Sequence, residues 1–201
     1  MQRSKSSIQL IFLVEAAMFL ALAYLLPFLT GQIQAFGQML SPMHLPVLLC
    51  GMVCGPWWGA AVGFSAPLLR SLTLGMPPIA VAPAMAVELA VYGLVAGLAR
   101  RLLPRKPLYL YIGLISAMLA GRAAYGVAML ILTGIRGGTY GLRTYFTAVF
   151  LNCWPGILLQ LIVIPPLVFV IDRWHRKNGI PLPGVEKNEQ KNGGFYVESS
   201  N

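Results

Sequence analysis

Charged residues are scarce in this 201-residue chain. Only 10% of its residues are Asp, Glu, Lys or Arg, and only six are acidic, whereas charged residues make up about 25% of a typical soluble domain. With 57% hydrophobic residues and a mean hydropathy of +0.71, the chain is expected to lie in a membrane. The net charge of +9 comes from short basic clusters between apolar runs. This pattern is typical of membrane topology signals and disfavours nucleic-acid binding.

Motifs for nucleotide binding and catalysis are missing as well. The chain has no Gly-x-x-x-x-Gly-Lys-Ser/Thr loop, no His-Glu-x-x-His and no Gly-x-Ser-x-Gly. The three cysteines, Cys50, Cys54 and Cys153, lie in apolar stretches. Their odd number and surroundings disfavour a disulfide framework or a metal site, and we expect Cys50 and Cys54 to act as small apolar residues. We therefore predict no cofactor, no metal and no catalytic residue.

Apolar runs that approach or exceed the roughly 20 residues of a spanning helix occur four times, and one further region is ambiguous. As a single helix, residues 45–74 would be about 45 Å long, half as long again as the membrane core of about 30 Å. Pro56 lacks an N–H and disfavours helix at Gly55, so we expect two helices folded back there. The predicted spans are 8–29, 45–54, 57–73, 83–99, 108–132 and 146–171.

The stretch CGMVCGPWWGAAVG at this turn has a glycine at every fourth position, 51, 55, 59 and 63. Glycines at this spacing let helix backbones approach closely in a membrane. We expect them to pack the two helices and to bind nothing themselves.

Basic residues set the expected orientation. With six spans and both termini in the cytoplasm, almost all loop lysines and arginines lie inside and only Arg136 and Arg143 lie outside, as the positive-inside rule requires. The chain is thus expected to be an all-α, multi-pass protein of the cell membrane. Residues 1–177 form its six-helix domain, and the polar stretch 178–201 is predicted to be a disordered cytoplasmic tail.

Polar side chains within the predicted spans gather in the outer half of the membrane. Ionisable residues there are costly and are functional candidates by default. We predict a pocket open to the outside, built from five spans and lined by His44, Arg70, Glu88, Arg122, Tyr125 and Asn152. A lone buried charge is unfavourable, so we expect Glu88 to pair with Arg122 or Arg70. The guanidinium left over would suit an anionic ligand.

Structural roles for the same residues are the alternatives. Glu88 and Arg122 could form a structural ion pair that fixes the packing of two helices. Arg70 could extend to the outer lipid headgroups, and His44 could cap a helix. Asn152 could bind backbone freed by a nearby proline. Glu15 lies in the inner half of the first span, away from the predicted pocket, and is expected to make a helix contact.

Four local runs, together with the span pattern, carry a resemblance to a known family. They are SPMHLPVLLCGMVCG, PLLRSLTLGMPP, ELAVYGLVAGL and LNCWPGILLQLIVIP, and the first span adds Ala17 and Ala21 as an AxxxA motif. Over residues 8 to 175 the chain resembles the substrate-binding S components of energy-coupling factor (ECF) vitamin transporters.

The resemblance implies that the chain binds a vitamin from outside without ATP. It also implies that Ala17 and Ala21 dock on a transmembrane coupling subunit that carries two ATPase subunits. Glu88, Tyr92, Arg122, Tyr125 and Asn152 fall on spans that the family uses for binding. Pantothenate is our first candidate substrate, with riboflavin, cobalamin, folate and lipoate left open. The alternatives are a self-sufficient small secondary transporter and, more weakly, an intramembrane enzyme.

Overall fold

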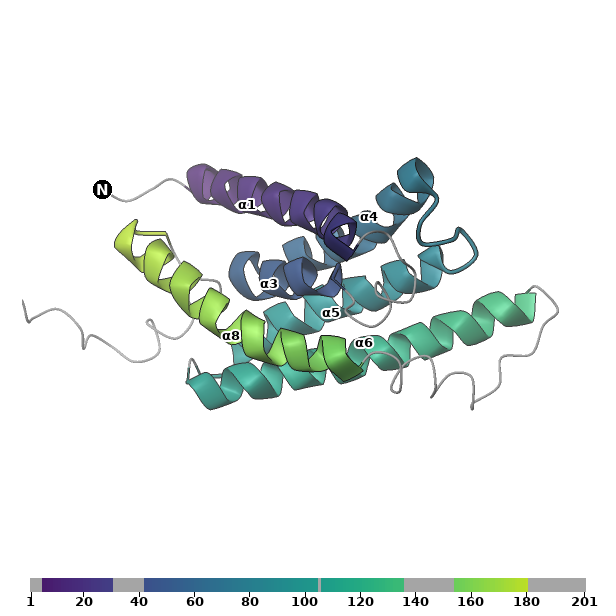
Figure 1. Cartoon of the computed structure of the whole chain (residues 1–201). Coiled ribbons are helices and arrows are strands. Elements are labelled where there is room, and N and C mark those ends of the chain that lie inside the picture. The colour runs from purple at the N-terminus through teal and green to yellow at the C-terminus, as the bar shows by residue number, and fades with distance from the viewer. Residues whose placement is uncertain (1–4, 31–41, 105, 136–153, 181–201) are drawn as a thin grey trace, which may run out of the picture.

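The computed structural model describes residues 5–30, 42–104, 106–135 and 154–180. Within these ranges every secondary-structure element is a helix, which confirms that the protein is all-α. The elements are α1 (Lys5–Leu25), the 3₁₀ helix η1 (Leu26–Thr30), α3 (His44–Cys54), α4 (Pro56–Leu74), α5 (Ala82–Leu102), α6 (Pro107–Ile135) and α8 (Trp154–Lys177) (Figure 1).

The ambiguous region is broken into two helices, as the sequence predicts. α3 ends at Cys54, and α4 begins with Pro56 in its first turn, where a missing N–H removes no hydrogen bond. Gly55 between them has a φ of 105°, which glycine adopts without strain. The helices fold back so closely that a Cβ on Gly59 would lie 2.5 Å from the Cα of Gly51.

Glycines from three helices meet beside this turn, in what we call the glycine junction: Gly51, Gly59, Gly63, Gly93 and Gly97. A Cβ on Gly59 would lie 2.8 Å from the carbonyl oxygen of Gly93 in α5, and a Cβ on Gly63 would lie 2.5 Å from the carbonyl carbon of Leu89. The prediction that the period-four glycines bring backbones together is therefore confirmed. The main partner of α4 here is α5, through Gly93 and Gly97. The glycine spacing alone did not predict this partner.

The short helix α3 lies at the centre of the molecule. All of its residues except Leu45 are buried, and it packs against α1, α4, α5 and α8. At about 1.5 Å per residue, its eleven residues reach only about half of the membrane core. Because neighbouring helices surround it, its length does not have to match the bilayer.

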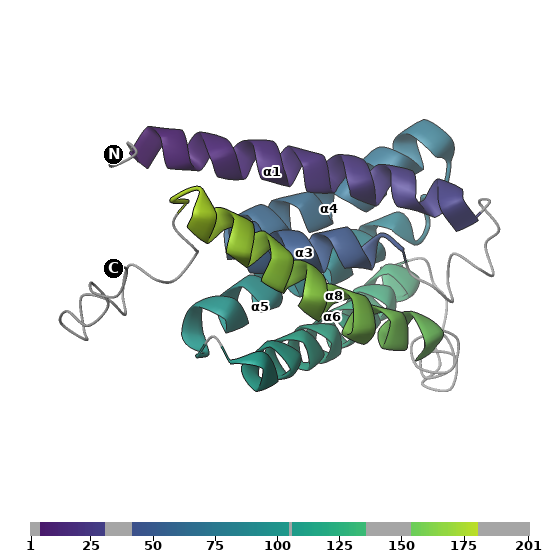
Figure 2. The same ribbon diagram turned by 60° about the vertical axis from the view of Figure 1, so that its left-hand side comes forward.

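The helices lie side by side and present two ends (Figures 1 and 2). We call the end where α1 begins the N-terminal end. It also contains the turn at Gly55, the connection between α5 and α6, and the last turns of α8. The opposite end contains η1, the beginning of α3 and the end of α4. Thr73 bonds there with Tyr24, their hydroxyl oxygens 3.0 Å apart.

Within the described residues, four helices are long and apolar enough to cross a membrane, judged by length and composition. They are Ser6–Phe28, Ala82–Leu102, Pro107–Ile135 and Pro155–Lys177. Large apolar side chains are exposed along them, such as Leu10 on α1, Leu119 on α6 and Ile162 on α8, as expected for surfaces in contact with lipid. The number of six spans and the orientation of the termini stay predictions.

α8 continues past the predicted span end at residue 171 to Lys177. A Schellman motif ends it: Gly179 adopts a φ of 63°, and the N–H of Ile180 donates to the carbonyl of His175 over 2.9 Å. Ile180, at the position that is often apolar in this motif, is buried. Residues 181–201, most of the predicted tail, lie outside the described residues.

Candidate functional site

Three helices bring His44, Glu88 and Arg122 together in what we call the central cluster. His44 begins α3, Glu88 lies two turns into α5, and Arg122 lies near the middle of α6. One carboxylate oxygen of Glu88, Oε1, is 3.6 Å from Nε2 of His44 and 3.8 Å from Nε of Arg122. The predicted pairing of Glu88 with Arg122 is therefore confirmed, and His44 is a second partner.

The central cluster is almost completely buried. The side chains of His44, Glu88 and Arg122 are 5%, 6% and 8% exposed. Both ring nitrogens of His44 and the Oε1 atom of Glu88 have no hydrogen-bond partner, because the ion-pair distances are too long for direct hydrogen bonds. Buried polar atoms in proteins are nearly always hydrogen-bonded, so these atoms are candidates to bind a polar group placed beside them.

Tyr92 forms one wall of the central cluster. Its fully buried ring lies edge-on to the imidazole of His44, with centroids 5.1 Å apart and planes at 75°. Gly121, next to Arg122 on α6, makes room for this ring, because a Cβ there would lie 3.0 Å from two Tyr92 ring carbons. α5 and α6 can therefore approach closely just where they supply the charged pair.

Arg70 is buried but bonds elsewhere. Its Nη1 donates to the backbone carbonyl of Tyr24 over 2.7 Å, and its guanidinium carbon lies 5.1 Å from the centroid of the Phe28 ring. The guanidinium thus satisfies a carbonyl at the C-terminal end of α1 and stacks on η1. Arg70 was predicted to line the pocket, but its observed contacts tie α4 to α1.

Of the two remaining predicted site residues, the structure describes only Tyr125. Tyr125 follows Arg122 by one turn of α6 and is partly buried, while Asn152 lies outside the described residues. Gln160 of α8 is 1% exposed, and its side-chain oxygen has no hydrogen-bond partner. Among the described residues, no three His, Cys, Asp or Glu side chains are grouped so that they could hold a metal ion.

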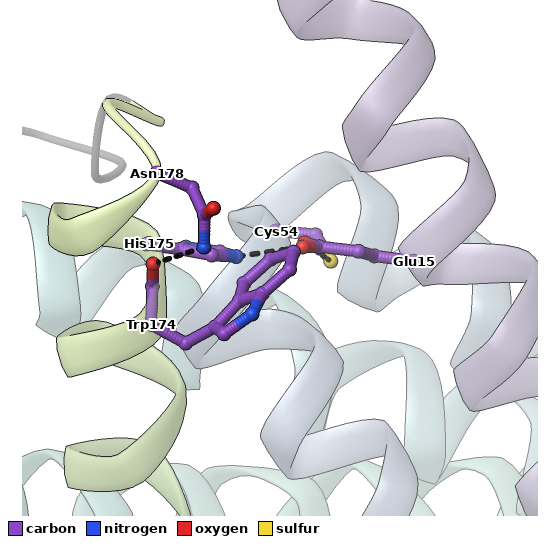
Figure 3. Close-up of polar contacts among 5 residues, drawn as sticks. All are labelled: Glu15, Cys54, Trp174, His175 and Asn178. Atoms are coloured by element: carbon purple, nitrogen blue, oxygen red, sulfur yellow. Dashed lines mark hydrogen bonds and ion pairs between the residues drawn. The ribbon is translucent and has the colours of Figure 1, made fainter.

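A second group of buried polar residues lies at the N-terminal end of the bundle (Figure 3). Oε1 of Glu15 is 2.6 Å from Nε2 of His175, and Sγ of Cys54 donates to the other carboxylate oxygen over 3.6 Å. The predicted helix contact of Glu15 is therefore confirmed. Cys54 is buried as expected but also acts as a weak donor, which corrects its interpretation as a purely apolar residue.

The sequence pattern did not identify Asp172 and His175 as residues with a structural role. They belong to the sequence DRWHRK, whose arginines and lysine are among the basic residues predicted to lie in the cytoplasm. Asp172 forms an ion pair with Arg100 of α5, and both side chains are less than a tenth exposed. The signal in the sequence is the spacing: residues three apart share one face of a helix, so Asp172 and His175 face the same side of α8.

Comparison with known proteins gives one match. A family model described as "ECF transporter, substrate-specific component" matches residues 12–168. This range contains the central cluster and the AxxxA motif, and it ends before Asp172 and His175. No curated protein and no solved structure matches the chain.

Proposed function

Because the chain belongs to the family of substrate-specific components of ECF transporters, we propose that it captures one vitamin at the central cluster and delivers it across the membrane with an ATP-driven module. Membership of the family makes the chain a membrane-bound, substrate-binding subunit for micronutrient uptake, and not an enzyme. The intramembrane enzyme considered as an alternative is thereby excluded. Which vitamin binds, and where, is our proposal.

The observation that carries the proposal is the burial of the Glu88–Arg122 ion pair beside His44, with Oε1 of Glu88 and both ring nitrogens of His44 left without a hydrogen bond. Charged groups inside a membrane protein are costly and usually belong to a substrate or ion pathway. A purely structural ion pair would gain from direct hydrogen bonds between its members. The 3.6 Å between Glu88 and His44 is too long for a direct hydrogen bond, which supports a role for these two side chains in binding a ligand.

The chemistry of the central cluster favours a ligand with several kinds of polar group. The guanidinium of Arg122 suits a carboxylate, whereas the carboxylate of Glu88 needs a donor such as a hydroxyl or an amide N–H. A neutral His44 offers one donor and one acceptor. Pantothenate carries a carboxylate, hydroxyls and an amide, so it is our first candidate. Riboflavin, cobalamin, folate and lipoate are the other candidates.

We expect the purified chain to contain or bind one vitamin tightly in the absence of ATP. Mass spectrometry of the ligand that co-purifies would identify it, and titration with the five candidate vitamins would check its affinity. Liposomes that contain this chain alone should not accumulate the vitamin, whereas a self-sufficient transporter would do so. Failure to find any tightly bound vitamin would contradict the proposal.

The proposed orientation places the N-terminal end of the bundle in the cytoplasm. The described basic side chains outside the spans predicted from the sequence lie at this end, among them Arg101, Lys106 and Arg176, and all three are exposed. The positive-inside rule then puts the beginning of α3 and the central cluster in the outer half of the membrane. This arrangement supports entry of the vitamin from outside.

We propose that α1 docks on the transmembrane coupling subunit, which carries two ATPase subunits. Ala17 and Ala21 are exposed on α1, while Ala16, Phe19 and Ala23 form its buried face. Small exposed residues four apart allow close approach of another helix. The AxxxA motif is therefore available to a partner and is not used up by packing within the chain.

Ala17→Trp should stop vitamin uptake and leave vitamin binding unchanged. The indole would hold the partner helix away without touching the central cluster. Uptake by cells that express the full transporter, compared with binding to the purified chain, would test this. Leu119→Trp, at an exposed apolar position on α6, is the matched control. Normal uptake by the Ala17→Trp variant would contradict the docking role.

A further inference from the structure

The polar group at the N-terminal end joins helices that are far apart in the sequence. Glu15 lies on α1 and His175 on the last turns of α8, 160 positions later. His175 is fully buried, and the side chain of Glu15 is 16% exposed. The ring of Phe12 on α1 also lies near that of His175, with centroids 6.4 Å apart. Figure 3 shows the carboxyl group of Glu15 between His175 and Cys54.

The position of His175 is itself fixed by surrounding contacts. The Schellman motif that ends α8 uses the carbonyl of His175 as an acceptor. The side chain of Asn178 donates to the carbonyl of Trp174 over 2.8 Å. The ion pair between Asp172 and Arg100 holds the same face of α8 to α5. The end of α8 is therefore a fixed support to which α1 is attached through Glu15.

At its C-terminal end α1 is held to α4 by the hydrogen bonds of Tyr24 with Arg70 and Thr73, and between the two ends its contact with the bundle is apolar. Its buried face consists of Ala16, Phe19 and Ala23, packed on α3 and α4. Within a membrane, burying an apolar helix face gives no hydrophobic gain over contact with lipid, because lipid tails are equally apolar. A hydrogen bond of 2.6 Å, in contrast, depends on distance and angle. It can thus fix the rotation of the N-terminal half of α1, as the bonds of Tyr24 do at the other end.

That rotation decides where the docking face points. Glu15 precedes Ala17 by two positions, which corresponds to about 200° around a helix of 3.6 residues per turn. The two residues therefore lie on opposite sides of α1. When Glu15 is held by His175, Ala17 and Ala21 face away from the bundle, and both are exposed.

We propose that the Glu15–His175 contact is a positioning element that holds the docking face of α1 toward the coupling subunit. The inference rests on the docking role proposed above for Ala17 and Ala21. It assigns no contact with the vitamin to Glu15 or His175, which lie at the other end of the bundle from His44. His175 lies beyond the range that the family model matches.

The test separates positioning from stability. In the double variant Glu15→Leu/His175→Leu, both polar groups are replaced by apolar ones, and such replacements of buried pairs are often neutral or stabilising. We expect its thermal unfolding midpoint to stay close to that of the wild type. Co-purification of the coupling and ATPase subunits with the tagged chain should fall about fivefold or more, the usual lower range of coupling between sites.

Single variants provide the matched comparison. Glu15→Gln keeps a hydrogen-bonding side chain opposite His175 and should dock like the wild type, whereas Glu15→Leu should dock as poorly as the double variant. If the double variant does not fold, the comparison of the two single variants tests the proposal. Equal docking by Glu15→Gln and Glu15→Leu would overturn it.

Ala17→Trp distinguishes the two proposals. If Ala17→Trp blocks docking and the double leucine variant docks normally, the positioning role is wrong while the docking face stands. If Ala17→Trp docks normally, the docking face is wrong and the positioning role is overturned with it. Loss of docking in both variants supports both proposals.

Discussion

Gly93→Ala should lower the free energy of unfolding by about 2 kcal/mol or more, although alanine is the better helix former. A Cβ at this position would meet the carbonyl group of Gly59 and lie 2.8 Å from its Cα. Both contacts are with backbone atoms of a neighbouring helix, which cannot move aside as a flexible side chain can. The junction of α3, α4 and α5 would have to open.

Unfolding in mixed micelles with increasing SDS, followed by tryptophan fluorescence, would measure this effect. Gly134→Ala is the matched control, since a Cβ on this α6 residue would meet nothing within 4 Å. The control should be neutral or slightly stabilising, because alanine loses less backbone entropy in a helix than glycine does. Equal stability of Gly93→Ala and the wild type would show that the backbones of α4 and α5 leave room for a Cβ at position 93.

The glycine junction also shows how far the sequence could predict the fold. The break at Gly55 followed from the length of residues 45–74 and from the chemistry of Pro56. The close approach of backbones followed from the period of four. The identity of the partner helix did not follow, because any of several glycine-containing helices could have packed there. Gly93 and Gly97 form a GxxxG pair in α5, which indicates a close helix contact in the sequence. The pair does not show which helix makes that contact.

The polar residues show a similar limit. Depth in the membrane can be estimated by counting residues along a span, and it placed His44, Glu88 and Arg122 at similar levels. The direction in which a side chain points around its helix cannot be estimated without knowing the neighbours. Arg70 has a suitable depth but bonds with Tyr24. His175 was missed because α8 continues beyond its apolar run.

Arg122→Ala should weaken vitamin binding about 100-fold, which is the usual consequence of truncating one member of a buried charge pair. Two effects contribute. The ligand loses its guanidinium partner, and Glu88 is left with His44 as its remaining ion-pair partner of those observed. The vitamin affinity of Arg122→Lys should lie between those of Arg122→Ala and the wild type. Lysine keeps the positive charge but lacks the planar guanidinium that binds a carboxylate through two hydrogen bonds.

Glu15→Ala is the matched control, because it also removes one member of a buried pair but at the N-terminal end of the bundle. It should bind the vitamin like the wild type and lose docking instead. Isothermal titration of both purified variants with the vitamin that co-purifies would measure the difference, and thermal unfolding would show that both are folded. If the two variants bound the vitamin equally well, the central cluster could not be the substrate site. The opposite result would place vitamin binding and docking at separate ends of one bundle, so that each could be altered without the other.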